Sequence, residues 1–100
     1  MPLYKSIQVD STTKVLVWKI TESFTDLFRE VALKDVCLHR LEGMKSELHQ
    51  RGFLSVRKLL AQAGYTDFDL YYDQNGKPNL RDGRHISITH SFEFSAMIIS

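Results

Sequence analysis

Apolar and β-branched residues are concentrated in two stretches near the N-terminus, residues 3–9 and 14–20. The four residues between them, Asp10-Ser11-Thr12-Thr13, have the composition of a tight turn, so the pattern predicts an antiparallel β-hairpin. Apolar side chains then recur at the i, i+3, i+4 and i+7 spacing of a helical face. This spacing predicts a short amphipathic helix, with Ser23 and Asp26 as its cap pair, built on Phe24, Leu27, Phe28 and Val31.

The rest of the chain predicts one long helix followed by short strands. Helical periodicity continues over residues 36–63, and Gly64 suits the end of that helix. Asn75-Gly76 predicts a type I′ hairpin turn. We therefore expect one α+β domain, with an N-terminal hairpin and a long helix packed on a small antiparallel sheet. The later strands of that sheet are expected at residues 69–73, 85–91 and 93–99.

One charged residue interrupts the apolar face of the predicted long helix. Lys45 lies four residues after Leu41 and three before Leu48, in the middle of that face. A lysine there either extends its ammonium group to solvent or reaches an anion, such as a phosphate, in a neighbouring cleft. Gly52 on the same face predicts the close approach of another element. The opposite face carries a stripe of charge that we expect to be solvated, formed by Arg40, Glu47, Arg51 and Lys58.

Composition and charge narrow the class of protein. The chain has 100 residues, with 13 Lys and Arg against 12 Asp and Glu, a hydrophobic fraction of 43% and a charged fraction of 25%. These values are typical of a soluble domain and give no support for general binding to nucleic acid or to an anionic membrane. Cys37 has no partner for an intramolecular disulfide, and no export signal is present, so we expect a cytoplasmic protein. The four histidines lack metal-site spacing, and we expect no metal ligand here.

Two short segments in the second half of the chain have a possible role in binding. Gly76-Lys77-Pro78 forms part of an ordinary hairpin turn, or presents backbone N–H groups and the Lys77 charge to a phosphate. In the segment Ser87-Ile88-Thr89-His90-Ser91, alternation places His90 on the same face as Ile86 and Ile88. His90 is then either a core histidine or a donor that emerges into a cleft, where it would suit a pyrophosphate.

The order and spacing of these segments resemble the N-terminal half of the Sfp-type 4′-phosphopantetheinyl transferases. That family shows a Gly-Lys-Pro element followed by an Asn-Ile-Ser-His-Ser element. Gly76-Lys77-Pro78 matches the first outright, and residues 87–91 match the second with Ser for Asn and Thr for Ser. Val56-Arg57-Lys58-Leu59-Leu60 is similar to the family's Arg-x-Leu-Leu helix segment. The resemblance covers about residues 40–100.

The resemblance implies a pseudodimer of two similar α+β halves with coenzyme A in the cleft between them. With Mg²⁺, such an enzyme transfers the phosphopantetheine arm to a serine of an acyl, peptidyl or aryl carrier protein and releases 3′,5′-ADP. The matching positions imply coenzyme A contacts at Lys77, Pro78, Thr89 and His90. The family also has a basic residue early in the long helix that binds a phosphate. Lys45 is the best candidate for it, ahead of Arg51 and Arg40.

The chain departs from the family in one respect that matters for activity. The family's metal ligands lie in a Gly-Ile-Asp-x-Glu motif, which does not occur here. We therefore expect the N-terminal half of a transferase, with no catalytic residue and no Mg²⁺ ligand of its own, inactive alone. The alternative is a non-catalytic interaction module that forms a homodimer through one strand face, which carries Phe92, Phe94, Ala96 and Ile98. Dependence on coenzyme A would separate the two.

Overall fold

The N-terminal hairpin forms as its sequence predicts. In the computed structural model, which describes residues 3–91 and 93–100, β1 (Leu3–Gln8) pairs antiparallel with β2 (Lys14–Lys19). The Asp10 carboxylate closes the connection by accepting hydrogen bonds from the backbone N–H groups of Thr12 and Thr13, both at 2.8 Å. These bonds lower the pKa of Asp10. The turn chemistry therefore comes from an Asx-type side chain, as the composition indicated.

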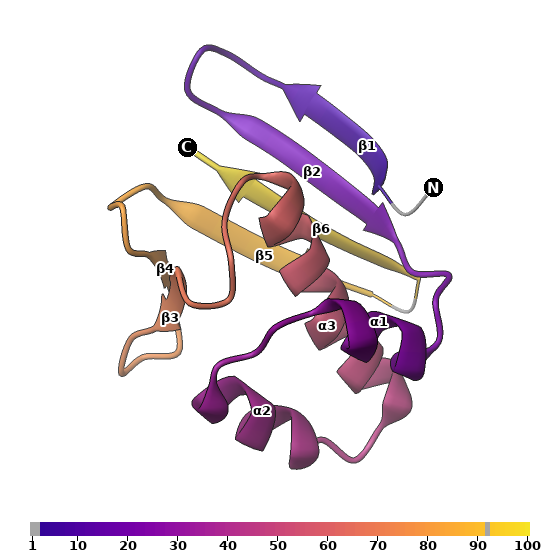
Figure 1. Ribbon diagram of the computed structural model, residues 1–100. Helices are drawn as coiled ribbons and strands as arrows, with labels where there is room; N and C mark the ends of the chain where they lie inside the picture. Colours follow the sequence, from indigo (N-terminus) through magenta and orange to yellow (C-terminus); the bar gives the residue numbers. More distant parts are fainter. Residues whose placement is uncertain (1–2, 92) are drawn as a thin grey trace.

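The main sheet is antiparallel and combines strands from the first and last parts of the sequence. β5 (Ile86–His90) and β6 (Phe94–Ile99) join the hairpin in the order β1-β2-β6-β5 (Figure 1). β6 therefore lies between β2 and β5, and Ser95 is aligned with Trp18 on one side and His90 on the other. Cross-strand partners share a face. Trp18, Ser95 and His90 consequently point to the same side of the sheet.

The prediction of a single helix over residues 36–63 is wrong, because the chain forms two helices there. α2 (Asp35–Glu42) ends at Gly43, and α3 (Glu47–Gln62) begins after Ser46, whose hydroxyl accepts from the His49 N–H at 3.4 Å. The Gln50 side chain donates to the carbonyl of Met44 at 3.2 Å, which stabilises the connection. The helix end at Gly43 and the N-cap at Ser46 interrupt the helix, although the hydrophobic periodicity runs through this segment. The predicted first helix is confirmed as α1 (Phe24–Glu30), capped by Ser23.

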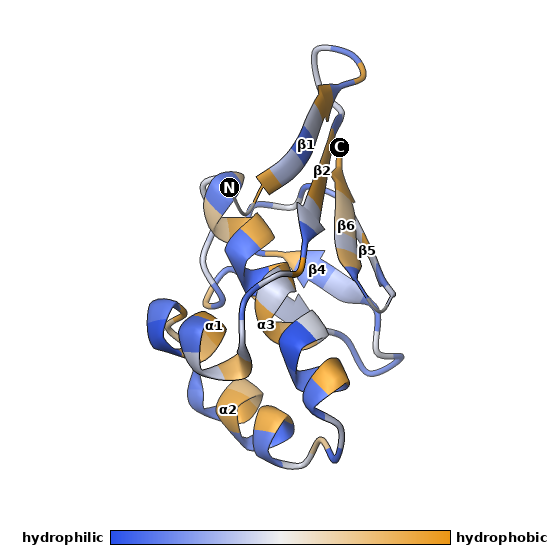
Figure 2. Cartoon of the chain, turned by 90° about the vertical axis from the view of Figure 1, so that its right-hand side faces the viewer, coloured by the Kyte–Doolittle hydropathy of each residue, from blue (hydrophilic) through white to orange (hydrophobic). Residues whose placement is uncertain are grey.

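All of these helices lie on one face of the main sheet (Figure 2). α3 crosses it, and the core between the two layers includes Trp18, Leu54, Leu59 and Met97, each at most 2% exposed. The expected close approach at Gly52 is confirmed: a Cβ atom there would lie 3.2 Å from Nδ1 of His90. The missing side chain lets the end of β5 lie against the α3 backbone.

A second, smaller hairpin lies beside the main sheet. β3 (Leu70–Tyr72) pairs with β4 (Pro78–Leu80). The predicted type I′ turn is wrong, because among the described residues a positive φ occurs only at glycines, including Gly76 at +80°. A type I′ turn would need it at Asn75 as well. Instead the Asp73 carboxylate accepts from the N–H groups of Asn75 and Lys77, at 2.8 and 3.0 Å.

The structure is thus a compact α+β domain with an antiparallel sheet, as the sequence predicts. Within residues 3–91 and 93–100, no helix has the length and apolar character needed to cross a membrane.

Candidate functional site

A cavity of about 350 Å³ lies between α2, α3, the β3–β4 hairpin and the outer edge of β5. We call it the first cavity. Apart from Tyr72, its titratable lining residues are all basic, and none of the described Asp or Glu residues lines it. A concave site with one sign of charge concentrates counter-ions, so this cavity is suited to an anion. The basic residues that line it are Arg40, His49, Arg57 and His90.

His90 is placed at the cavity by its position at the end of β5. Its ring lies against Gly52 of α3 and perpendicular to the ring of His49, with the two ring centroids 6.3 Å apart. The residue is exposed rather than buried in the core. Of the two sequence interpretations, His90 as a histidine that emerges into a cleft agrees with this geometry. Both rings can present nitrogen atoms to an anion.

Arg40 reaches the cavity from the last turn of α2. Its guanidinium carbon lies 4.7 Å above the centre of the Tyr72 ring, and Tyr72 also lines the cavity. The ring face attracts the cation and restricts it, while the N–H groups at the guanidinium edge remain able to donate. Sequence reasoning ranked Arg40 below Lys45, because it treated α2 and α3 as one continuous helix.

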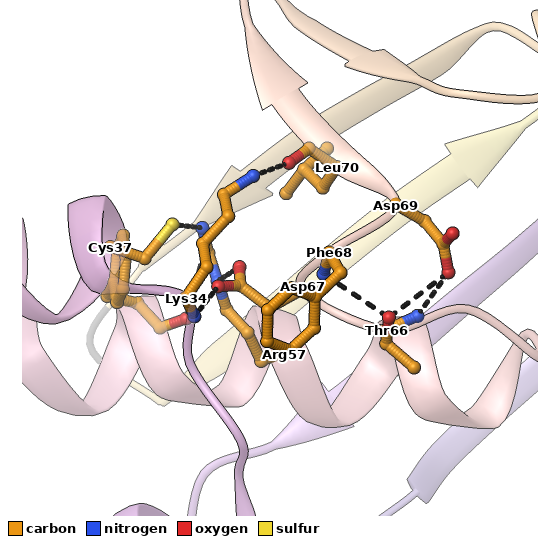
Figure 3. A network of polar contacts seen from close by, with 9 residues as sticks. Lys34, Cys37, Arg57, Thr66, Asp67, Phe68, Asp69 and Leu70 are labelled. Atoms are coloured by element: carbon orange, nitrogen blue, oxygen red, sulfur yellow. Dashed lines mark hydrogen bonds and ion pairs between the residues drawn. The ribbon is translucent and has the colours of Figure 1, made fainter.

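Arg57 forms the inner wall of the cavity and is held by a buried network (Figure 3). Its Nε donates to the Asp67 carboxylate at 2.9 Å, and its guanidinium lies 3.7 Å from the centre of the Phe53 ring. Burial opposes the charged form, but the neighbouring Tyr72 and Asp67 outweigh that effect, and the pKa of Arg57 lies above its ordinary value. Because Asp67 neutralises this charge, Arg57 is a structural part of the wall, and Arg40 and the two histidines are the groups that can donate to a ligand.

Cys37 belongs to the same network and has no reactive role in it. A guanidinium nitrogen of Arg57 donates to its sulfur at 3.6 Å, and the residue is 4% exposed. Burial, followed by the hydrogen bond with Asp67, raises the pKa of the Cys37 thiol. The backbone N–H of Lys34 also donates to Asp67, at 3.0 Å, so this carboxylate joins α3 to the start of α2 (Figure 3).

The structure brings two of the expected contact residues, Pro78 and His90, to the first cavity. Thr89 is on the opposite side of the sheet, because it alternates with His90 along β5. Lys77 lines a different cavity, on the other side of Pro78.

The helix residues considered for a phosphate contact also separate. Lys45 lies in the connection between α2 and α3, exposed to solvent and away from the cavity lining, so the helical periodicity that placed it on the apolar face does not apply. Arg51 donates to the carbonyl oxygens of Glu22 and Ile20, at 2.9 and 3.4 Å, and fixes the loop before α1. Arg40 is therefore the candidate that the fold directs to the cavity.

The residues of the first cavity do not fit a magnesium ion. Mg²⁺ prefers carboxylate and other oxygen ligands, whereas this lining supplies guanidinium and imidazole groups. In the part of the chain that the structure describes, no group of three or more His, Cys, Asp or Glu side chains could hold a metal.

Comparison of the chain with models of known protein families and with curated proteins finds no match.

Proposed function

We propose that this chain supplies half of the coenzyme A site of an Sfp-type 4′-phosphopantetheinyl transferase. One observation carries the proposal: Gly76, Pro78 and His90, which belong to the two motifs of the resemblance, line the same cavity although they come from different hairpins. The cavity also has the cationic lining that a nucleotide with several phosphates requires.

The chemistry of the lining divides into an anion-binding part and an apolar part. Arg40 and His90 supply donors for phosphate oxygens, and the other walls include Tyr72, Pro78 and Ile88, which suit a base or a ribose. A volume of about 350 Å³ accommodates part of a coenzyme A molecule rather than all of it. The remaining part would extend toward a second half of the enzyme, which would also supply the Mg²⁺ ligands and the general base.

In the proposed reaction, a serine hydroxyl of an acyl, peptidyl or aryl carrier protein attacks the phosphorus atom that bears the pantetheine arm. The bond to the 3′,5′-ADP leaving group breaks, and the serine proton passes to a base outside this chain. This chain's groups bind and orient the nucleotide, so the chain alone is proposed to be inactive. Its proposed location is the cytoplasm.

The test is calorimetric titration of the chain with coenzyme A and with 3′,5′-ADP. His90→Ala and Arg40→Ala should each weaken binding about tenfold, because each removes a charge-assisted contact worth roughly 1.5 kcal/mol or more. Lys45→Ala, the matched control, should change affinity less than about twofold, since Lys45 does not line the cavity. A wild-type chain that binds neither ligand at millimolar concentration would overturn the proposal.

The alternative function, a self-associating interaction module, has its own supporting observation. The sheet face away from the helices, which we call the open sheet face, carries cross-strand rows of apolar residues. Ile7 and Ile98 remain 42% and 46% exposed on it. Phe94 and Ala96, named for this role from the sequence, also lie on it, whereas Phe92 lies outside the described residues. The open sheet face is defined by Ile7, Val15, Val17, Phe94, Ala96 and Ile98.

A further inference from the structure

A second cavity, of about 320 Å³, lies where β4 leads into β5. Pro78 lines both cavities and separates them. None of the described acidic residues lines the second cavity either. Its polar lining includes Tyr71, Lys77, Arg84, His85 and Ser87.

Two carboxylates lie near the basic groups of this second cavity, Asp73 near Lys77 and Asp82 near Arg84. Among the described residues, neither Lys77, Arg84 nor His85 forms an ion pair. The nearest carboxylates along the chain are already engaged. Asp82 accepts from the Tyr65 hydroxyl at 2.6 Å and from the Arg84 N–H at 2.9 Å, and Asp73 accepts from two backbone N–H groups of its own turn. Lys77 and Arg84 therefore keep side-chain N–H donors for an outside anion, because no ion pair with a described residue occupies them.

Hydrogen bonds hold the Arg84 guanidinium and the backbone of Lys77 in place. One guanidinium nitrogen of Arg84 donates to the carbonyl of Thr12 at 2.6 Å, which ties it to the β1–β2 turn. The backbone of Lys77 is fixed on one side by the Asp73 carboxylate and on the other by the Asn79 side chain, which donates to its carbonyl at 2.9 Å. Such restraint lowers the entropy lost when a ligand is bound.

The backbone of β5 adds a neutral donor. His85 and Ser100 exchange hydrogen bonds at 2.9 Å in both directions, which sets the alternation along β5. In an antiparallel pair, the next residue, Ile86, then directs its N–H away from β6. Ile86 also lines the second cavity, so this N–H lies on its side of the strand.

We propose that the second cavity is a separate binding site for a phosphate oxyanion, with Lys77 and Arg84 as its charged groups and His85 as a further hydrogen-bond donor. The oxyanion has two possible sources. It is either another phosphate of the nucleotide in the first cavity, reaching across Pro78, or an independent phosphate. Only the first source rests on the proposed function. Arg84 supplies a planar donor group and Lys77 a point charge, the usual combination around phosphate.

The experiment is a titration of the ¹⁵N-labelled chain with inorganic phosphate, followed by the backbone amide shifts of residues 77, 84 and 85. Saturable shifts are expected at all three. Lys77→Gln and Arg84→Gln should each weaken binding about fivefold, the loss of roughly 1 kcal/mol per charged contact. Arg81→Gln is the matched control, because it removes the same charge from the same connection but does not line the cavity, and it should change affinity less than about twofold.

The outcomes separate this site from the first one. If saturating coenzyme A abolishes the phosphate shifts, the second cavity holds a phosphate of coenzyme A; if the shifts persist, it holds an independent phosphate. Either result supports the site. Absence of shifts at residues 77, 84 and 85, or an equal effect of Arg81→Gln, overturns it. Failure of coenzyme A to shift the amides of residues 40 and 90 would instead count against the proposed function.

Discussion

Arg57 is a buried charged side chain that is held by several partners at once. It is 4% exposed, and its guanidinium is shared between a carboxylate, an aromatic ring and a thiol. Its partner Asp67 is 2% exposed and contacts the backbone of a different segment, at Lys34. Removing one member of a buried pair leaves the other charge without compensation in a medium that solvates it poorly.

Arg57→Ala should therefore lower the free energy of unfolding by roughly 3–5 kcal/mol, measured by urea denaturation. Arg40→Ala serves as the control, because Arg40 borders the same cavity but is exposed, and it should cost less than about 1 kcal/mol. Equal losses in the two variants would contradict the structural role that we assign to Arg57.

At this scale the short motifs agree with the geometry only in part: Pro78 and His90 line the first cavity, whereas Lys77 and Thr89 of the same motifs do not. Residues with a distant partner give no local signal at all. The role of Arg57 depends on Asp67, which lies ten residues later in a loop. Nothing in the helical spacing of Arg57 could reveal that partner, because only the tertiary fold brings the loop back to α3.

The break between α2 and α3 is the element that sequence reasoning missed, and it displaced Lys45 from the predicted site. The signals were present: Gly43 is a common helix end, and Ser46 is a favourable N-cap. The apolar positions on either side nevertheless fit one continuous helical face. A connection as short as residues 43–46 changes the phase of that face too little for periodicity alone to detect it.

Substitution of Gly52 tests whether the close contact between α3 and β5 positions the His90 ring in the first cavity. In Gly52→Ala, the added methyl group should displace the His90 ring, which lies 3.2 Å from the Cβ position. Alanine also favours the helix by about 1 kcal/mol, so we expect overall stability to change by less than that amount. Binding of 3′,5′-ADP should weaken at least about threefold, measured by calorimetry, since the ring moves within the site.

Ala61→Gly, at an exposed position of the same helix, is the control, because it changes the helix propensity without adding or removing a contact with His90. It should lower stability by about 1 kcal/mol and leave the affinity for 3′,5′-ADP unchanged. A Gly52→Ala variant with wild-type affinity and an unshifted His90 ring resonance would show that the close approach does not position His90.

For the molecule as a whole, the one-sided arrangement of helices predicts self-association. Apolar residues of the open sheet face lose exposed area if two copies pair through it. Ile98→Lys places a charge on that face and should shift the chain toward monomer at concentrations of about 100 µM, measured by sedimentation velocity.

Val36→Lys is the matched control, since Val36 is 68% exposed on α2, on the other side of the molecule. It should leave the sedimentation profile unchanged. If the two variants sediment alike, the open sheet face does not drive association, and the interaction-module alternative loses its support.

The position of β6 in the middle of the sheet has a consequence for biosynthesis. The hairpin of β1 and β2 is complete early in translation, yet its inner edge has no partner until residues 94–99 have left the ribosome. Only then can β5, α3 and the hairpin be joined into one layer. The nascent chain therefore carries an unpaired strand edge while the helices are being synthesised, and until β6 pairs with β2 that edge is open to pairing with other chains.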